Sequence, residues 1–261
     1  PVKKIITEDG VAKSLLVRNN KIHAADIIIS ATDWHYTAFD ALDGKFVDQK
    51  MLDLKNLKGL EVFFSVMQFS FGINADLSHL PHFSRYPLDE PLVSPDGTSY
   101  ERMEVHIYNY DDTLAPKGKT SVVVSYYTKN REFWIDARKN DRPKYRASKK
   151  EFLDKIIALL DVRLGGIKDK IEEVDMATPA TFNRYTNNWK GSTQGWLPGK
   201  NLLATPPVNF TFPGLANFYY SSHWNQPGGG LPIAIKTGRE VAKLICKNNK
   251  VPFKIKRNFE C

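Results

Sequence analysis

The chain has 261 residues and a formal net charge of +8, with 42% hydrophobic and 25% charged residues. This is the composition of a globular protein that can bury one large core or two modest ones, and it excludes a disordered chain. No apolar run approaches the roughly 20 residues of a membrane-spanning helix. The two cysteines, Cys246 and Cys261, have no metal-binding spacing, so we expect no disulfide framework, no metal and a cytoplasmic setting.

The positive charge is densest between residues 117 and 150. Such a region is typical of a surface that meets anionic lipid or nucleic acid, and a merely solvated basic face is the alternative. Nucleic acid is not expected, because no zinc-finger spacing or aromatic RNA-binding block accompanies the charge. Peripheral membrane contact through this region stays open.

Alternating apolar residues open the chain. Residues 2–6 and 11–17 predict two strands, and Glu8-Asp9-Gly10 between them is a hairpin signal. Residues 21–30 predict a third strand. Its end, Ile27-Ile28-Ile29, is apolar at every position, which is typical of a strand covered on both faces.

A short helix is expected next. Thr32 or Asp33 can cap a helix that runs from Trp34 to about Leu42, and Gly44 can end it.

Aromatic strands dominate the middle of the chain. Residues 61–73 predict a long strand that is apolar enough on both parities to be buried on both sides, and residues 103–110 and 120–128 predict two more. The prolines between residues 74 and 101 predict a long irregular loop, either a binding loop or a surface excursion. The aromatic strands could wall an apolar tunnel or form a plain core.

A helix, a strand and a second helix follow. The sequence from Ser148 to Glu151 predicts a capping box that opens an amphipathic helix, which Gly165-Gly166 stops. Residues 170–177 predict a strand, and Thr178-Pro179 the start of a short helix. Residues 186–214 predict little regular structure.

The C-terminal segment combines a strand at 216–221, the turn Pro227-Gly228-Gly229-Gly230 and a helix from 231 to about 247, which Asn248-Asn249 can end in a left-handed conformation. Glycines leave the backbone open to a planar ligand, and a helix N-terminus offers unpaired amides and a positive dipole end. Alone, this pattern predicts only a turn, since neither a P-loop nor Gly-x-Gly-x-x-Gly occurs in the sequence.

Three segments, in family order, resemble the phytoene desaturase family, which includes phytoene dehydrogenase-like proteins, carotenoid isomerases and retinol saturases. The segment from Asn217 to Ile245, with the glycine run, resembles the family's C-terminal flavin-binding segment. Residues 178–196 resemble the stretch that approaches the flavin. The first hairpin with residues 25–33 is similar to the meander and return strand of the family's cofactor domain.

The resemblance implies an α+β fold in which one part is the remnant of an α/β domain. It would comprise the rear part of an FAD-binding Rossmann-like domain with a β-meander, plus a mixed-sheet substrate domain with helices on one side. Residues 1–58 would be the rear part of the FAD-binding domain, residues 59–189 the substrate domain and residues 190–261 the C-terminal part of the FAD-binding domain. Without the family's N-terminal glycine motif, we expect a fragment that alone binds FAD weakly or not at all.

The resemblance also implies a set of cofactor-binding residues. The glycine run would touch the isoalloxazine edge, the first strand would border the adenine, and two tryptophans would line the flavin-facing pocket. The set is Val2, Lys3, Ala31, Thr32, Trp189, Trp196, Ser222, Gly229, Gly230 and Leu231. Family members usually have a glycine close to Ser222, so this serine adds bulk where the ribityl chain would pass.

The implied function is an FAD-dependent oxidoreductase acting on an apolar, polyene- or isoprenoid-like substrate such as a carotenoid, by hydride transfer to or from flavin. No side chain is assigned as catalytic. Ser221-Ser222-His223 does not predict a hydrolase, because neighbouring strand residues point to opposite faces. Two alternatives stay open: a non-catalytic partner- or lipid-binding segment without cofactor, and an amine oxidase-type flavoenzyme.

Overall fold

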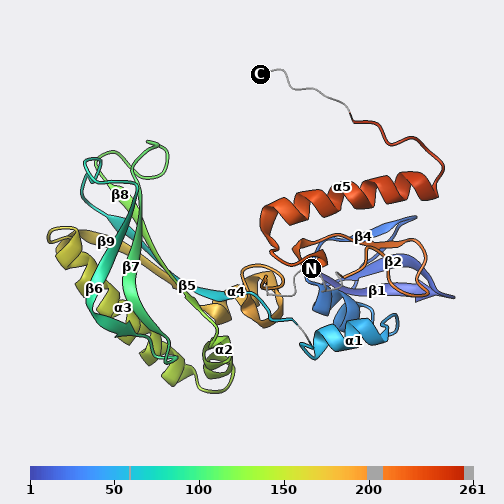
Figure 1. Cartoon of the computed structure of the whole chain (residues 1–261), viewed down its shortest axis with the longest axis horizontal. Helices are drawn as coiled ribbons and strands as arrows, with labels where there is room; N and C mark the ends of the chain where they lie inside the picture. The colour runs from blue at the N-terminus through green and yellow to red at the C-terminus, as the bar shows by residue number, and fades with distance from the viewer. Residues whose placement is uncertain (59, 199–207, 256–261) are drawn as a thin grey trace. The chain divides into compact units, whose positions relative to one another are not determined.

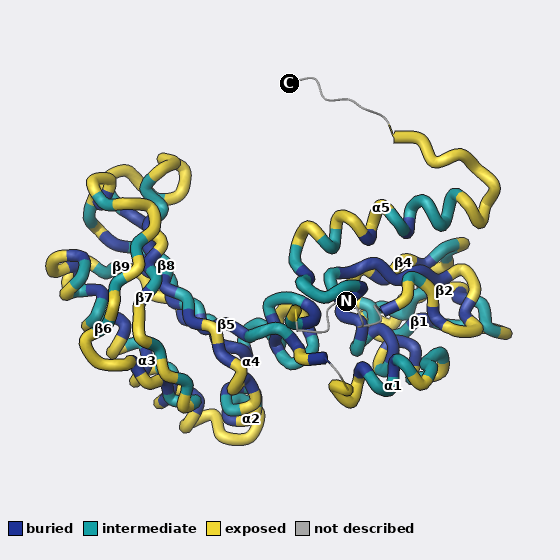
Figure 2. Tube along the Cα trace, viewed as in Figure 1, coloured by how far each residue is buried: buried dark blue, intermediate teal, exposed yellow. Residues whose placement is uncertain are grey.

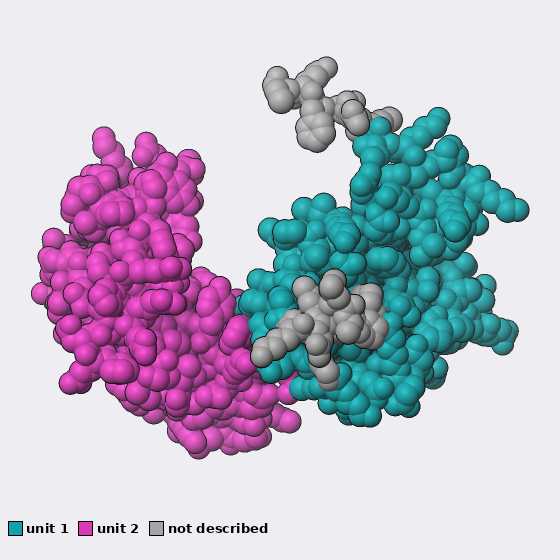
Figure 3. Space-filling view, in the orientation of Figure 1, with its two compact units in different colours: residues 1–63, 187–189, 193–261 teal, residues 64–186, 190–192 magenta. Residues whose placement is uncertain are grey.

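The computed structural model describes residues 1–58, 60–198 and 208–255. It divides into two compact units (Figure 3). Each unit combines helices with sheet. Unit 1 comprises residues 1–63, 187–189 and 193–261, and unit 2 comprises residues 64–186 and 190–192. The boundaries expected from the sequence lie after residues 58 and 189, whereas the chain changes unit after Phe63, Thr186, Trp189 and Ser192.

The described residues of unit 1 form two small sheets (Figure 1). An antiparallel meander joins, in this order, β1 (Val2–Glu8), β2 (Val11–Val17) and β3 (Ile22–Ala24). The hairpin at Asp9 and Gly10 is confirmed, and both residues have positive φ, as a tight hairpin turn requires. The second sheet pairs β4 (Ile28–Ser30) in parallel with β10 (Phe218–Tyr220).

The third strand expected at residues 21–30 is wrong as a single element. The chain bends at Asp26, so that β3 extends the meander while β4 joins the parallel sheet. Ile28 is buried, but Ile29 is 51% exposed. Burial on both faces is therefore also wrong: alternate strand residues point to opposite faces, and only the Ile28 face packs into the core.

The helices of unit 1 are η1 (Tyr36–Ala41), α1 (Gln49–Lys55), η4 (His223–Asn225) and α5 (Gly230–Asn248). The helix expected from Trp34 is present, but η1 winds as a π-helix. Asp33 caps the helical turn that begins at Trp34 and leads into η1, since its Oδ1 accepts a hydrogen bond from the amide of Tyr36. The left-handed end expected at Asn248-Asn249 is wrong: Asn249 has φ −93°, and Lys250 takes the positive φ.

Unit 2 is a five-stranded antiparallel sheet in the order β6-β7-β8-β5-β9. The strands are β5 (Ser65–Ile73), β6 (Phe83–Val93), β7 (Ser99–Tyr108), β8 (Thr120–Thr128) and β9 (Ile171–Ala177). The expected mixed sheet is wrong, because every strand pair in this sheet is antiparallel. The helical elements are α2 (Arg131–Asn140), α3 (Arg142–Arg163), η2 (Lys168–Lys170) and α4 (Pro179–Thr186), while η3 (Trp189–Gly191) spans the change of unit.

One face of this sheet packs against α2 and α3. Phe69 and Phe71 of β5 and Val124 of β8 form a single core with Phe152 and Ile156 of α3. Buried positions recur along β5 (Figure 2), while Gln68 and Ser70 on its other parity are half-buried. Within unit 2 the aromatic strands therefore form a plain core on their buried parity.

Two expectations for unit 2 are wrong. The loop expected at residues 74–101 contains β6, which tolerates Pro87 and Pro91 because it is an edge strand. The helix expected from Ser148 begins at Arg142, because Asp141 caps it and Pro143 fits the first turn.

Within the described residues, no helix has the length and apolarity to cross a bilayer.

Candidate cofactor site

The carboxyl ends of β4 and β10 lie at one edge of their sheet, because the two strands are parallel. The amide of Ser221 continues the pairing by donating to Ser30 O at 2.9 Å. Ala31 and Thr32 follow β4 at this edge, and the segment that leads to α5 follows β10. The crevice beyond the carboxyl ends of parallel strands is where open α/β sheets bind ligands.

A cluster of hydroxyl groups closes the end of β4. The side-chain oxygens of Ser30, Thr32 and Thr37 lie within 2.8 to 3.1 Å of one another. The Tyr220 hydroxyl donates to the backbone carbonyl of Thr32 at 3.0 Å. Burial raises the pKa of Tyr220 well above its ordinary value, so this phenol stays protonated and remains a donor.

Asp33 is a buried carboxylate at the same edge. Its Oδ1 accepts from the amide of Tyr36 and its Oδ2 from the amide of Trp189, both at 2.8 Å. Burial, partly opposed by these hydrogen bonds, raises the pKa of Asp33 to about 6. The carboxylate thereby holds the backbone of Trp189, the first residue of η3, beside the start of η1.

Four tryptophans pack together in unit 1. The ring centroids of Trp34, Trp189, Trp196 and Trp224 lie 5.1 to 6.0 Å apart in five contacting pairs. Trp196 Nε1 donates to Trp224 O at 3.0 Å, and Trp224 Nε1 donates to Asn188 Oδ1 at 2.8 Å. Trp34 Nε1 is buried and has no hydrogen-bond partner within the described residues.

The glycine run packs directly on this cluster. Gly228, Gly229 and Gly230 all have positive φ, and the amide of Gly228 donates to Trp196 O at 3.1 Å. A Cβ at Gly229 would lie 2.8 Å from Gly195 N, whereas a Cβ at Gly230 would meet nothing closer than Gln194 Oε1 at 3.5 Å. Backbone packing therefore requires glycine at 229. At residue 230 the positive φ angle alone requires glycine.

The 19-residue helix α5 begins at this point. The first amides of a helix have no acceptor inside the helix, and they form the positive end of its dipole. Leu231, in the first turn, is 78% exposed. The site therefore offers a bare, electropositive stretch of backbone beside a buried tryptophan cluster.

The structure brings only part of the expected site together. Trp189 and Trp196 lie in the tryptophan cluster, and Trp196 contacts the glycine run. Ala31 and Thr32 lie at the edge of β4. Val2 O accepts from the Tyr36 hydroxyl at 2.8 Å, which links β1 to η1. Lys3 is turned to the meander, where its Nζ donates to Asn20 Oδ1.

Ser222 has a structural role in this fold. Its Oγ accepts from the amide of Trp224 and its amide donates to Asn225 Oδ1, a reciprocal cap on η4. The Ser221 hydroxyl instead pairs with the Thr237 hydroxyl at 3.3 Å. His223 begins η4 and does not continue β10, so the argument from neighbouring strand residues does not apply to it; its Nε2 is buried without a partner in the described chain. Burial also lowers the pKa of His223, which favours the neutral ring.

Sequence reasoning missed three contributors to this site. Asp33 was expected only as a cap, and its second oxygen reaches a residue far along the chain. Trp34 and Trp224 were not singled out. Several tryptophans occur in the segments of the expected site, which could have indicated an aromatic cluster. Which of them contact one another depends on tertiary packing, which the sequence pattern does not show.

Comparisons with known proteins support the family resemblance. No protein-family model matches the chain. Over 233 residues the chain is 23% identical to a 1-hydroxycarotenoid 3,4-desaturase from Flavobacterium sp. (strain P99-3), covering 87% of this chain and 45% of that protein. The chain therefore spans less than half the length of this relative, and it is similar to phytoene desaturase-like oxidoreductases.

Solved structures of putrescine oxidase share the fold. A triple mutant with redesigned cofactor binding matches with a TM-score of 0.58 at 12% identity, over 95% of this chain and 48% of that one. The wild-type enzyme bound to putrescine gives the same TM-score and identity, over 94% of this chain and 48% of that one. At this identity the likeness shows a common fold and nothing about substrate.

Proposed function

We propose that this chain is the rear part of an FAD-dependent, phytoene dehydrogenase-like oxidoreductase that acts on an apolar polyene or isoprenoid molecule. The observation that carries the proposal is the run of positive-φ glycines that opens α5 at the carboxyl edge of β4 and β10. A desaturase relative and an oxidase fold support it. Unit 1 would be the rear of a Rossmann-like cofactor domain, and unit 2 the substrate domain.

The residues of unit 1 fit the ring end of such a cofactor. Gly230 presents backbone with no side chain and has room beside it, and Trp34 offers a buried indole N–H without a partner in the described residues. Hydride chemistry would come from the bound flavin. The amides that open α5 would stabilise negative charge on the reduced ring without rearrangement.

This chain offers fewer contacts to the ribityl and pyrophosphate end of the cofactor. The hydroxyl oxygen of Ser222 accepts a hydrogen bond in the η4 cap, so its proton is what it would offer to a ribityl chain. Lys3 already binds Asn20. Since Gly-x-Gly-x-x-Gly is missing from the sequence, most pyrophosphate contacts are missing too, and we propose that this chain alone binds FAD weakly.

The test is the visible absorption spectrum of the product of the complete gene, purified beside the 261-residue chain. The complete product should carry flavin and the chain alone little or none. In the complete product, Gly230→Val should lower the flavin-to-protein ratio strongly. Gly238→Ala, in the same helix with only Ser221 Oγ at 3.8 Å, is the matched control and should retain flavin. A folded but colourless complete product would favour the alternative of a non-catalytic partner- or lipid-binding segment.

An amine oxidase-type enzyme is the second candidate, and the fold shared with putrescine oxidase favours it. The two candidates differ in the polarity of the substrate. Oxygen consumption or dye reduction by the flavin-loaded protein should respond to a carotenoid if the first proposal holds. It should respond to a diamine such as putrescine if the second holds.

The basic region suggests that the protein would take up an apolar substrate at a membrane surface. Exposed cations gather on α2 and the start of α3: Lys139, Arg142, Lys144, Arg146 and Lys150. We propose that this surface makes peripheral contact with anionic lipid at the cytoplasmic side of a membrane. Binding to phosphatidylserine-containing vesicles should fall steeply as salt rises, and binding that ignores salt would discard this part of the proposal.

A further inference from the structure

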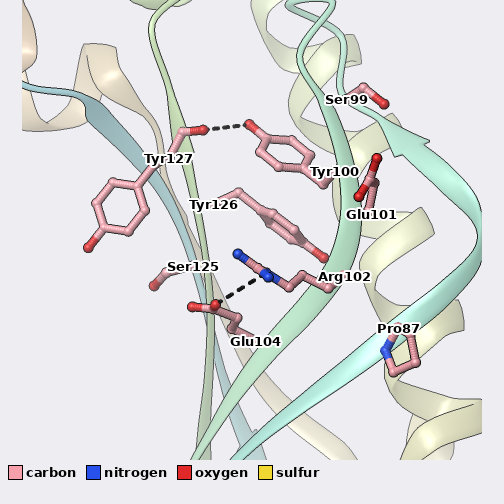
Figure 4. A pocket seen from close by; sticks show the side chains of 9 residues that line it. All are labelled: Pro87, Ser99, Tyr100, Glu101, Arg102, Glu104, Ser125, Tyr126 and Tyr127. Carbon is pink, nitrogen blue, oxygen red and sulfur yellow. Dashed lines mark hydrogen bonds and ion pairs between the residues drawn. The ribbon is translucent and has the colours of Figure 1, made fainter.

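The sheet of unit 2 opens between β7 and β8. The two strands pair from Val105–Val124 to Tyr108–Ser121, and no strand pairing is recorded between their remaining halves within the described chain. Side chains bridge the opening instead: the Tyr100 hydroxyl donates to Tyr127 O at 3.0 Å. Beyond it, the hydroxyls of Thr98 and Thr128 lie 3.0 Å apart. The opening is a pocket of about 610 Å³ (Figure 4).

Aromatic rings wall this pocket. The rings of Tyr100 and Tyr126 lie 4.4 Å apart between centroids, whereas the ring of Tyr127 points away from them on the other side of β8 (Figure 4). The charged side chains at the rim include an ion-paired cluster. Glu104 Oε1 lies 2.9 Å from Arg85 Nε and 3.7 Å from Arg102 Nε. The pocket thus combines an aromatic wall with two carboxylates, Glu101 and Glu104, and the charge of Glu104 is balanced by the two arginines.

Tyr126 is the polar group that this arrangement does not explain. It is 3% exposed, and its hydroxyl has no hydrogen-bond partner among the described residues. Its ring extends from β8 across the opening towards β7 (Figure 4). Burial, with a smaller contribution from Tyr100 and Glu104, raises the pKa of Tyr126, so the hydroxyl stays protonated. A buried hydroxyl without a partner destabilises a fold unless something binds it.

We propose that the opening between β7 and β8 binds an apolar alcohol. The ligand hydroxyl accepts a hydrogen bond from Tyr126 and donates one to the carboxylate of Glu104, and its hydrocarbon body lies against the tyrosine rings. A pocket of this volume is within the usual range for small-molecule sites. The site uses residues of unit 2 alone and needs no flavin, so it goes beyond the function proposed above.

The chemistry of the pocket selects an alcohol over charged ligands. A carboxylate would be placed beside Glu104, and like charges repel. At Glu104, the carboxylate that the proposal uses, an ammonium group would compete with two guanidinium groups that already face its Oε1. A hydroxyl can accept from Tyr126 and donate to Glu104 at once, since a hydroxyl carries one donor and two lone pairs.

Calorimetric titration of the 261-residue chain with geraniol, a water-soluble isoprenoid alcohol, tests the site. Wild type should bind, and Tyr126→Phe should weaken binding about tenfold, the factor expected for one buried hydrogen bond. Tyr110→Phe is the matched control, because Tyr110 is 60% exposed and lies outside the pocket, and it should bind as wild type does. Geranyl methyl ether, which keeps the acceptor but loses the donor, should bind more weakly than geraniol.

Three results would overturn the proposal: no binding of geraniol to a folded wild-type chain, equal affinity in wild type and Tyr126→Phe, or equal affinity for the alcohol and its ether. Folding is checked by the far-ultraviolet circular dichroism of each variant. Flavin content plays no part in the readout, so failure here is distinguishable from failure of the oxidoreductase proposal.

Discussion

The Oδ2 atom of Asp33 accepts a hydrogen bond from the backbone amide of Trp189 at 2.8 Å, across 156 positions of the chain. This bond connects residues 187–189, where the chain returns to unit 1, with the carboxyl end of β4. Because the carboxylate is buried, its ionisation makes the stability of unit 1 sensitive to pH, and the hydrogen bond opposes this effect only in part.

The pH dependence has a definite sign. Burial raises the pKa of Asp33 in the folded state to about 6, from 3.8. The folded state therefore holds the proton more tightly than the unfolded state, and the free energy of unfolding falls as pH rises from about 4 to about 6. The two-unit shift corresponds to about 3 kcal/mol at most, since one unit is about 1.4 kcal/mol.

Asp33→Asn isolates this contribution, because the amide cannot ionise yet can still accept from Tyr36. Urea unfolding of wild type and variant should be followed between pH 4 and pH 7. The stability of wild type relative to the variant should decrease by about 2–3 kcal/mol over that interval. A difference that stays constant with pH would show that Asp33 titrates normally.

The two glycines at the start of α5 should respond differently to alanine. Both have positive φ, which costs an L-residue roughly 1–2 kcal/mol. At Gly229 a Cβ would also lie 2.8 Å from a backbone nitrogen, so Gly229→Ala should cost about 3 kcal/mol or more, while Gly230→Ala should cost about 1–2. Thermal or urea unfolding of both variants measures the difference, and equal losses would contradict the packing of Gly229 on Gly195.

The candidate site could be located from the sequence only in part. The glycine run and the helix after it have a local pattern, because tight turns and helix starts are set by the residues they contain. The parallel pairing of β4 with β10 and the bond from Asp33 to Trp189 join segments that are far apart in sequence. No local pattern encodes such pairings, so only the family resemblance brought these segments together.

The fold shows the same division between local and long-range information. The Asp9-Gly10 hairpin and the stop at Gly165-Gly166 were predicted because each depends on its own dihedral angles. The strand β6 was missed because its prolines signal a loop, and only its position at the sheet edge makes them tolerable. The early start of α3 was missed because Ser148 satisfies the capping pattern without serving as a cap.

The cap of α3 provides the next prediction. Asp141 Oδ1 accepts from the amide of Lys144 at 3.0 Å, whereas Ser148 lies inside the helix. Asp141→Ala should lower the free energy of unfolding by about 1 kcal/mol, and Ser148→Ala should change it by less than about half of that. Chemical unfolding of the two variants makes the comparison. A larger loss for Ser148→Ala would restore the capping box that the sequence suggested.

Tyr126→Phe should stabilise the protein in the absence of ligand. The hydroxyl is buried without a partner in the described chain, and an unsatisfied buried polar group costs about 1–3 kcal/mol. Phenylalanine keeps the ring contacts with Phe69 and Phe152, so the free energy of unfolding should rise by about 1 kcal/mol. Urea unfolding without added alcohol measures this. A loss of stability instead would mean that the hydroxyl is already satisfied within the fold, and that the pocket between β7 and β8 has no unmet donor to offer a ligand.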